Sequence, residues 1–158
     1  MASSKNAQLA QMIHDKKEAF KRLCLGLDEE TSSRAPAGRW SPKQIVSHLC
    51  GPEGIGFLPS IRAFVEQDTP RLEIEAENPF YSENRARMTL AELLSQFDQE
   101  YKRMEDFVAG LSEEQLGRKA HIPLLKETEI GEYPTLQKWI EAIAGYHMEF
   151  HINHMREI

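Results

Sequence analysis

A chain of 158 residues that is 41% hydrophobic and 28% charged has the size and composition of one globular domain, and we expect residues 1–158 to form it. The formal net charge of −6, without a long run of Lys or Arg, argues against nucleic acid as a partner, because phosphate backbones are bound by concentrated basic surfaces. Two cysteines are too few for a disulfide scaffold, and neither a signal-type leader nor a membrane-length apolar stretch is visible, so we expect a cytoplasmic protein that does not enter the membrane.

The first half of the chain contains the signals of two helices. Apolar residues at helical spacing predict the first helix at about residues 5–25. The second has the clearest start, because Ser41-Pro42-Lys43-Gln44 places serine at the N-cap, proline at the first helical position and glutamine three residues after the cap. His48 then lies on or beside the apolar face of this helix. Gly51-Pro52 should interrupt the helix, since proline lacks the N–H, and the helical pattern resumes through Val65.

The second half begins with a long connection. Residues 68–88 combine two prolines with many charges and no sustained period, which predicts a crossover lying over the bundle or over a site. The third helix starts at the capping box Thr89-Leu90-Ala91-Glu92, and a loop over 117–134 precedes a last helix from about Thr135 to the chain end. Four helices with two long connections predict an all-α four-helix bundle. The predicted apolar seam of the third helix is Leu90, Leu94, Phe97, Tyr101, Met104, Val108 and Leu111.

Three histidines of the last helix share one face. His147, His151 and His154 are spaced i, i+4, i+7, and imidazoles aimed into a core are costly unless they are hydrogen-bonded or coordinated. One divalent metal ion would satisfy several of them, with His48 of the second helix as a further nitrogen ligand. Imidazole ligands with open positions favour Zn²⁺, Ni²⁺ or Fe²⁺ over Ca²⁺ or Mg²⁺. The histidines also continue the predicted core stripe, which is Leu136, Ile140 and Ile143.

Other interpretations of these polar residues remain open. Histidines near a helix C-terminus interact favourably with the helix dipole when protonated, and hydrogen-bonded core histidines need no metal. His154 is interpreted as an outer neighbour of the metal rather than a ligand. Glu53 is the only acid near His48 in the sequence; it is a candidate water-positioning base or outer-shell partner, or else a solvated surface residue. His14 and His121 are interpreted as surface or loop histidines.

Two stretches of the chain resemble the DinB/YfiT-like superfamily of metal-binding four-helix bundles. Residues 39–49 are similar to the family's Trp-Ser…His-Leu pattern at the start of its second helix, and residues 136–158 are similar to its closing helix. The resemblance implies that the family's three-histidine metal triad falls on His48, His147 and His151. The chain departs from the pattern at two places, which are Cys50-Gly51-Pro52 before Glu53, and His154 where relatives often carry glutamine.

The resemblance also implies a fold of DinB/YfiT type with long crossover loops, and two kinds of metal-dependent chemistry on an unknown small molecule. One is hydrolysis and the other is S-transfer with a low-molecular-weight thiol. The alternative is a non-catalytic, metal-stabilised bundle that binds a small molecule or a protein. A homodimer is also predicted, because relatives often pair through helices and apolar residues follow the Gly-Pro break at Ile55, Phe57 and Leu58.

Overall fold

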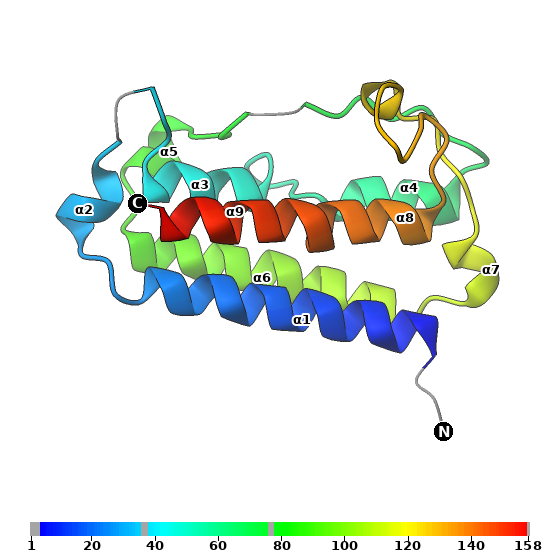
Figure 1. Ribbon diagram of the computed structural model, residues 1–158, viewed down its shortest axis with the longest axis horizontal. Coiled ribbons are helices and arrows are strands. Elements are labelled where there is room, and N and C mark those ends of the chain that lie inside the picture. Colours follow the sequence, from blue (N-terminus) through cyan, green and yellow to red (C-terminus); the bar gives the residue numbers. More distant parts are fainter. Residues whose placement is uncertain (1–3, 36–37, 76–77, 158) are drawn as a thin grey trace.

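The computed structural model describes residues 4–35, 38–75 and 78–157, and this part of the chain is helical without β-strands. The predicted all-α four-helix bundle is confirmed (Figure 1). Short helices lie in the connections, namely α2 (Glu29–Ser33), α5 (Glu83–Ala86), α7 (Glu113–Leu116) and the 3₁₀ turn η1 (Pro123–Leu125). The four long units are α1 (Lys5–Cys24), α3 (Pro42–Cys50) with α4 (Leu58–Glu66), α6 (Leu90–Ala109), and the run α8 (Leu136–Ile140), η2 (Glu141–Tyr146) and α9 (His147–Arg156).

The helices pack around one apolar core. Helix α1 lies against α6 and α9, α3 lies against the same two helices, and α4 packs on α8. Phe20 of α1 and Phe97 of α6 meet with ring centroids 5.1 Å apart, and Tyr101 lies 4.7 Å from Phe97. Figure 1 shows the crossover returning along the bundle from the end of α4 to α5, beside the start of α3. The predicted crossover at residues 68–88 is therefore present, with the short helix α5 at its end.

Both predicted capping boxes set the starts of long helices. Ser41 Oγ accepts a hydrogen bond from the Gln44 N–H at 3.2 Å, and Gln44 Oε1 accepts one from the Ser41 N–H at 2.8 Å. Thr89 and Glu92 exchange the equivalent pair at 3.1 Å each before α6. Helix α3 ends at Gly51 as predicted, with a φ of +75° that L side chains rarely adopt. His48 is thereby fixed in the last turn of a helix with a defined start and stop.

The last helix differs from the prediction in its register. Residues 141–146 form a π-helix, a wider turn that is frequent at functional sites and shifts the faces of the residues beyond it. Leu136 and Ile140 are fully buried as predicted, whereas Ile143 is only partly buried. Beyond the π turn the histidines lie beside the core stripe rather than on it. From the π turn onward the buried apolar residues are Ala144, Met148, Ile152 and Met155, and His151 beside them is also buried, at 4% exposed.

A similar shift of one position occurs in α6. Leu93 is fully buried, while the predicted seam residue Leu94 is only partly buried. The other predicted seam residues are buried, so the four-and-three spacing was right from Phe97 onward. The difference arises in the first turns of α6, where two leucines are adjacent and either of them continues the predicted apolar spacing.

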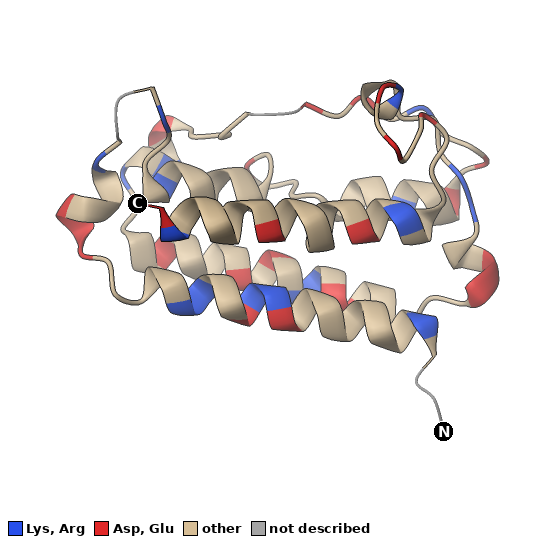
Figure 2. Ribbon diagram, viewed as in Figure 1, with Lys and Arg blue, Asp and Glu red and all other residues tan. Residues whose placement is uncertain are grey.

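The surface of the bundle carries charges of both signs. Figure 2 shows acidic and basic residues intermingled along α1 and α6. In the part of the chain that the structure describes, no helix has the length and apolar character to cross a membrane. The apolar stretch after the Gly-Pro break is divided, because Ile55 is 59% exposed whereas Phe57 and Leu58 pack partly against the core. The homodimer stays a prediction.

Candidate metal centre

Three histidines from two helices meet at one point. The Nε2 atoms of His48 and His147 are 2.8 Å apart, and those of His147 and His151 are 3.1 Å apart. One ring nitrogen from each of the three residues lies within 4.8 Å of the others. Helix α3 supplies His48 from its last turn, and α9 supplies the other two from successive turns. The structure therefore brings together the three residues that the sequence singled out as metal ligands.

Hydrogen bonds at the outer side of the rings determine where the protons lie. The Nδ1 atom of His48 is 2.6 Å from the carbonyl oxygen of Asn78, and because a carbonyl only accepts, this nitrogen carries the proton. The His147 ring is hydrogen-bonded to the backbone of Ile143. This bond acts to raise the pKa of His147, as expected when a ring N–H donates to a carbonyl. The unprotonated Nε2 of His48 therefore faces the Nε2 of His147 across 2.8 Å. A cation at this point would be bound by ring nitrogens from both helices.

The surroundings oppose protonation of the closing-helix histidines. Burial, and secondly the neighbouring His48, lower the pKa of His147 to about 4. Burial followed by His147, His48 and His154 lowers the pKa of His151 to about 2. Both rings are therefore neutral at pH 7, which is the form that binds a metal ion.

The donor set and its spacing fit a divalent transition metal. Two nitrogens about 2.0–2.1 Å from a tetrahedral Zn²⁺ are separated by roughly 3.3 Å, close to the observed 2.8 and 3.1 Å. Among the described residues, the buried Nδ1 of His151 has no hydrogen-bond partner. The carbonyl of Asn78 behind His48 is the kind of outer-shell acceptor that fixes a ligand's tautomer. Three imidazoles suit Zn²⁺, Ni²⁺ or Fe²⁺ better than hard cations.

The histidines line a cavity of about 820 Å³. This volume lies within the range of small-molecule pockets, which are typically apolar with a few convergent polar groups. The polar part of the lining includes Arg39 and Glu157, which form an ion pair of 2.9 Å near His154, together with Glu75 and Asn153. The apolar part of the lining includes Trp40, Phe57, Ile74, Trp139, Ile143 and Phe150.

The other candidate residues occupy different surroundings. His154 lines the cavity with its ring centroid 5.9 Å from that of His151, and within the described chain neither of its ring nitrogens has a hydrogen-bond partner. Glu53 is exposed and accepts a hydrogen bond of 2.7 Å from Asn84. That bond holds the pKa of Glu53 below its usual range, and Glu53 is not among the residues that line the cavity.

The two histidines interpreted as surface or loop residues lie away from the cavity. His14 of α1 is 3.5 Å from Glu105 of α6. His121 lies in the loop after α7, where its ring stacks on Tyr133 and its Nε2 is 3.0 Å from Glu132. Both rings are thus engaged elsewhere.

Sequence reasoning did not identify several neighbours of the centre. The ring centroid of Trp40 lies 5.0 Å from that of His48. Phe80 of the crossover stacks parallel to His48 at 6.3 Å, and Asn78 contributes only a backbone carbonyl. A backbone contact leaves no residue-type signal. For Trp40, the position directly before the Ser41 N-cap could have indicated proximity to the helix that carries His48.

Comparisons with known proteins agree with this architecture. The family model of the DinB superfamily matches residues 8–155. The solved structure of YfiT from Bacillus subtilis, described as a probable metal-dependent hydrolase with an unusual four-helix bundle topology, matches with a TM-score of 0.80. The match has 17% sequence identity and covers 99% of this chain and 87% of that one, so it establishes a shared fold. No curated protein matches the sequence.

Proposed function

We propose that this chain, which belongs to the DinB superfamily, is a metal-dependent hydrolase of a small molecule that has a substantial apolar part. The observation that carries the proposal is the convergence of three histidine nitrogens, within 4.8 Å of one another, on the wall of a cavity of about 820 Å³. The related fold of YfiT, described as a probable metal-dependent hydrolase, supports the same reaction class. A buried structural metal would not need such a cavity beside it.

The three histidines hold one divalent ion, which we propose to be Zn²⁺, Ni²⁺ or Fe²⁺. Such an ion, when bound, supplies Lewis acidity that activates water and polarises the bond to be cleaved. Because His147 and His151 have lowered pKa values, they are ready to bind the ion at neutral pH without releasing protons. The Asn78 carbonyl keeps the proton of His48 on the nitrogen that faces away from the ion.

The cavity binds the substrate and excludes water from it. Trp40 and Phe57 provide apolar contact area close to His48, where Trp40 lies 5.0 Å away between ring centroids. At the polar part of the lining, His154 offers one donor and one acceptor to a polar group of the substrate. Its pKa is lowered by burial and by the Arg39 cation, so it acts as a neutral hydrogen-bonding group.

The test is a comparison of metal-loaded forms of the purified protein. Metal-stripped protein reconstituted with Zn²⁺, Ni²⁺ or Fe²⁺ is assayed against chromogenic esters and amides that carry aromatic groups. We expect turnover with at least one metal, its loss in His147→Ala, and its retention in His121→Ala. Parallel reactions with a low-molecular-weight thiol and an electrophile detect S-transfer. Metal binding without turnover in any assay would contradict the proposal and favour a non-catalytic binding module.

A further inference from the structure

We infer that Arg85 is a positioning residue, which holds the crossover against α3 so that His48 keeps its metal-binding nitrogen unprotonated. This inference rests on the proposed metal role of His48. Arg85 lies in α5 and is 2% exposed, and the hydrogen bonds of its side chain go to Ser47, Gly51 and Phe80, so it is distinct from the proposed ligand set. The chain of contacts from Arg85 to His48 has three steps, each given by hydrogen bonds.

The first step joins the crossover to the end of α3. The Nη1 atom of Arg85 donates to the carbonyl oxygens of Gly51 at 2.6 Å and of Ser47 at 3.2 Å. These carbonyls belong to the C-terminal turn of α3, where a positive charge is favourable. Within the described part of the chain Arg85 has no carboxylate in ion-pair contact, so the cation is stabilised by backbone carbonyls. A buried arginine held this way specifies where α5 must lie.

The second step fixes the residues before α5. The carbonyl oxygen of Phe80 accepts from Arg85 Nη1 at 3.2 Å and from the Ser47 hydroxyl at 3.0 Å. Phe80 has a φ of +50°, a left-handed conformation that is unfavourable for a bulky residue. Such a conformation persists only where its surroundings enforce it. Arg85 and Ser47 provide that enforcement from the side of α3.

The third step reaches the metal ligand. The Asn78 side-chain oxygen accepts the Phe80 N–H at 2.7 Å, which fixes the turn between them. The Asn78 carbonyl then accepts from His48 Nδ1 at 2.6 Å. If this carbonyl moved away, the proton of His48 could occupy either nitrogen, and the fraction of rings protonated on Nε2 could not bind an ion. Loss of outer-shell partners of metal-bound histidines typically weakens metal binding about 10- to 100-fold. We expect a loss of Zn²⁺ affinity of about this size when the Asn78 carbonyl moves away from His48.

The experiment compares two arginines that join a connecting segment to a helix end. Arg118 donates to the Val65 carbonyl of α4 and to Glu114, so Arg118→Gln is the control for Arg85→Gln. Zn²⁺ affinity is measured by competition with a chromogenic chelator, and folding by thermal unfolding of the metal-free protein. We expect Arg85→Gln to bind Zn²⁺ about 10- to 100-fold more weakly, and Arg118→Gln to lose stability with its affinity within about twofold of the parent. A folded Arg85→Gln with unchanged affinity would overturn the inference.

A second readout does not depend on the metal. Nitrogen NMR of the metal-free protein reports the protonated nitrogen of His48, which we expect to be Nδ1 in the parent and mixed in Arg85→Gln. Should that variant fail to fold, Asn78→Ala removes the acceptor of the Phe80 N–H, and Asn78→Ser restores a hydroxyl acceptor. Mixed protonation of His48 in Asn78→Ala and its return to Nδ1 in Asn78→Ser support the inference. A single Nδ1-protonated form in both variants overturns it. If the variants change Zn²⁺ affinity and His48 protonation as expected but the parent shows no turnover, the proposed catalysis is contradicted and the role of Arg85 is not.

Discussion

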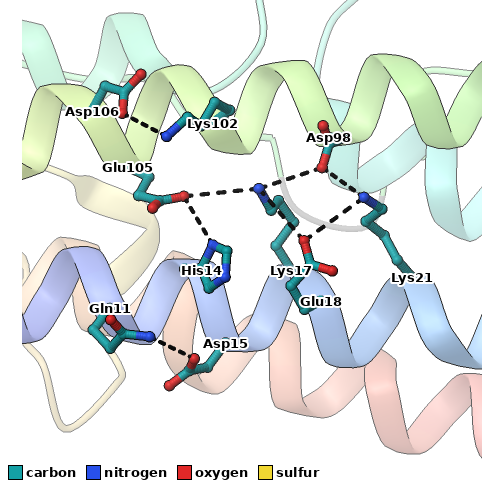
Figure 3. Close-up of polar contacts among 10 residues, drawn as sticks. All are labelled: Gln11, His14, Asp15, Lys17, Glu18, Lys21, Asp98, Lys102, Glu105 and Asp106. Atoms are coloured by element: carbon teal, nitrogen blue, oxygen red, sulfur yellow. Dashed lines mark hydrogen bonds and ion pairs between the residues drawn. The ribbon is translucent and has the colours of Figure 1, made fainter.

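The α1–α6 interface and the histidine centre both bury polar side chains, but they balance them differently. At the interface, the 4% exposed Lys17 lies 3.3 Å from Asp98 and 3.8 Å from Glu105, so the buried cation meets carboxylates of the neighbouring helix (Figure 3). Lys21 adds a second contact to Asp98 at 2.8 Å. Charges there face opposite charges, and the buried Oε2 of Glu105 is held by ion-pair contact rather than by a hydrogen bond among the described residues.

The histidine centre instead brings like groups together. The Nε2 atoms of His48 and His147 are 2.8 Å apart, and the outer nitrogen of His48 already serves the Asn78 carbonyl. The interface is therefore balanced by opposite charges of the chain itself, whereas the centre gathers ring nitrogens that we propose bind a cation. This difference separates a structural polar cluster from a binding site, since burial alone is common to both. The following predictions test it.

The largest expected effect is loss of metal binding in His147→Ala. The Nε2 atom of His147 lies 2.8 Å from that of His48 and 3.1 Å from that of His151, so its removal leaves two of the three converging nitrogens. We expect Zn²⁺ affinity to fall by at least about 100-fold, which removes roughly 2.7 kcal/mol or more of metal-dependent stabilisation. Thermal unfolding with and without Zn²⁺ measures this. His14→Ala is the control, and an equal loss of affinity there would contradict the distinction between the two regions.

The metal-free protein should lose stability as the pH falls from 6.5 towards 5. The pKa values of His147 and His151 are lowered in the folded state to about 4 and about 2, from an ordinary histidine value of 6.5. Below pH 6.5 the unfolded chain therefore binds protons that the folded chain does not, and the free energy of unfolding decreases by up to about 1.4 kcal/mol per pH unit for each histidine. Urea unfolding in the presence of a chelator measures the slope. His147→Gln should reduce the slope, and an unchanged slope would refute the assignment.

A smaller effect on stability is expected at the interface. Lys17→Met should lower the free energy of unfolding by about 1–2 kcal/mol, because Glu105 and Asp98 lose a buried partner while Lys21 remains at Asp98. Lys102→Met at the exposed pair with Asp106 should lower the free energy of unfolding by less than Lys17→Met does. Neither variant should alter Zn²⁺ affinity. Chemical denaturation and chelator competition together test both statements, and a weaker Zn²⁺ complex in Lys17→Met would link regions that we regard as independent.

The smallest effect is expected from His154→Ala. Its ring centroid is 5.9 Å from that of His151, and it lies one turn beyond the three converging rings. We expect Zn²⁺ affinity within about threefold of the parent, below about 0.7 kcal/mol. His151→Ala serves as the comparison, with a loss similar to that of His147→Ala. Equal losses in His151→Ala and His154→Ala would mean that the second residue is also a ligand.

Local signals in the sequence predicted much of the fold. The capping boxes at Ser41 and Thr89 and the break at Gly51 lie where they were expected, because they depend on neighbouring residues alone. The π turn of η2 was not predicted, since a stripe of Leu136 and Ile140 continues equally well through a regular helix. Its consequence is that the histidines border the cavity instead of the core.

The three candidate ligands could be identified from the sequence. The residues that hold His48 in place could not. The i, i+4 spacing places His147 and His151 on one face whatever the tertiary structure. His48 was a candidate because it follows the clear start of the second helix, and the resemblance pointed to the same residue. The contacts behind His48 depend on how residues 78–85 return to α3, which is a tertiary property without a periodic signal. A backbone carbonyl, a left-handed Phe80 and a buried Arg85 become visible only when the crossover is in place.

Zinc X-ray absorption of protein loaded with one equivalent of Zn²⁺ tests the central claim most directly. We expect three imidazole nitrogens at about 2.0–2.1 Å together with at least one further light-atom ligand, and the loss of one imidazole shell contribution in His48→Ala. The Nε2 separations of 2.8 and 3.1 Å require little movement of the rings to reach that geometry. A six-oxygen shell, or a spectrum unchanged in His48→Ala, would contradict a metal centre formed by His48, His147 and His151.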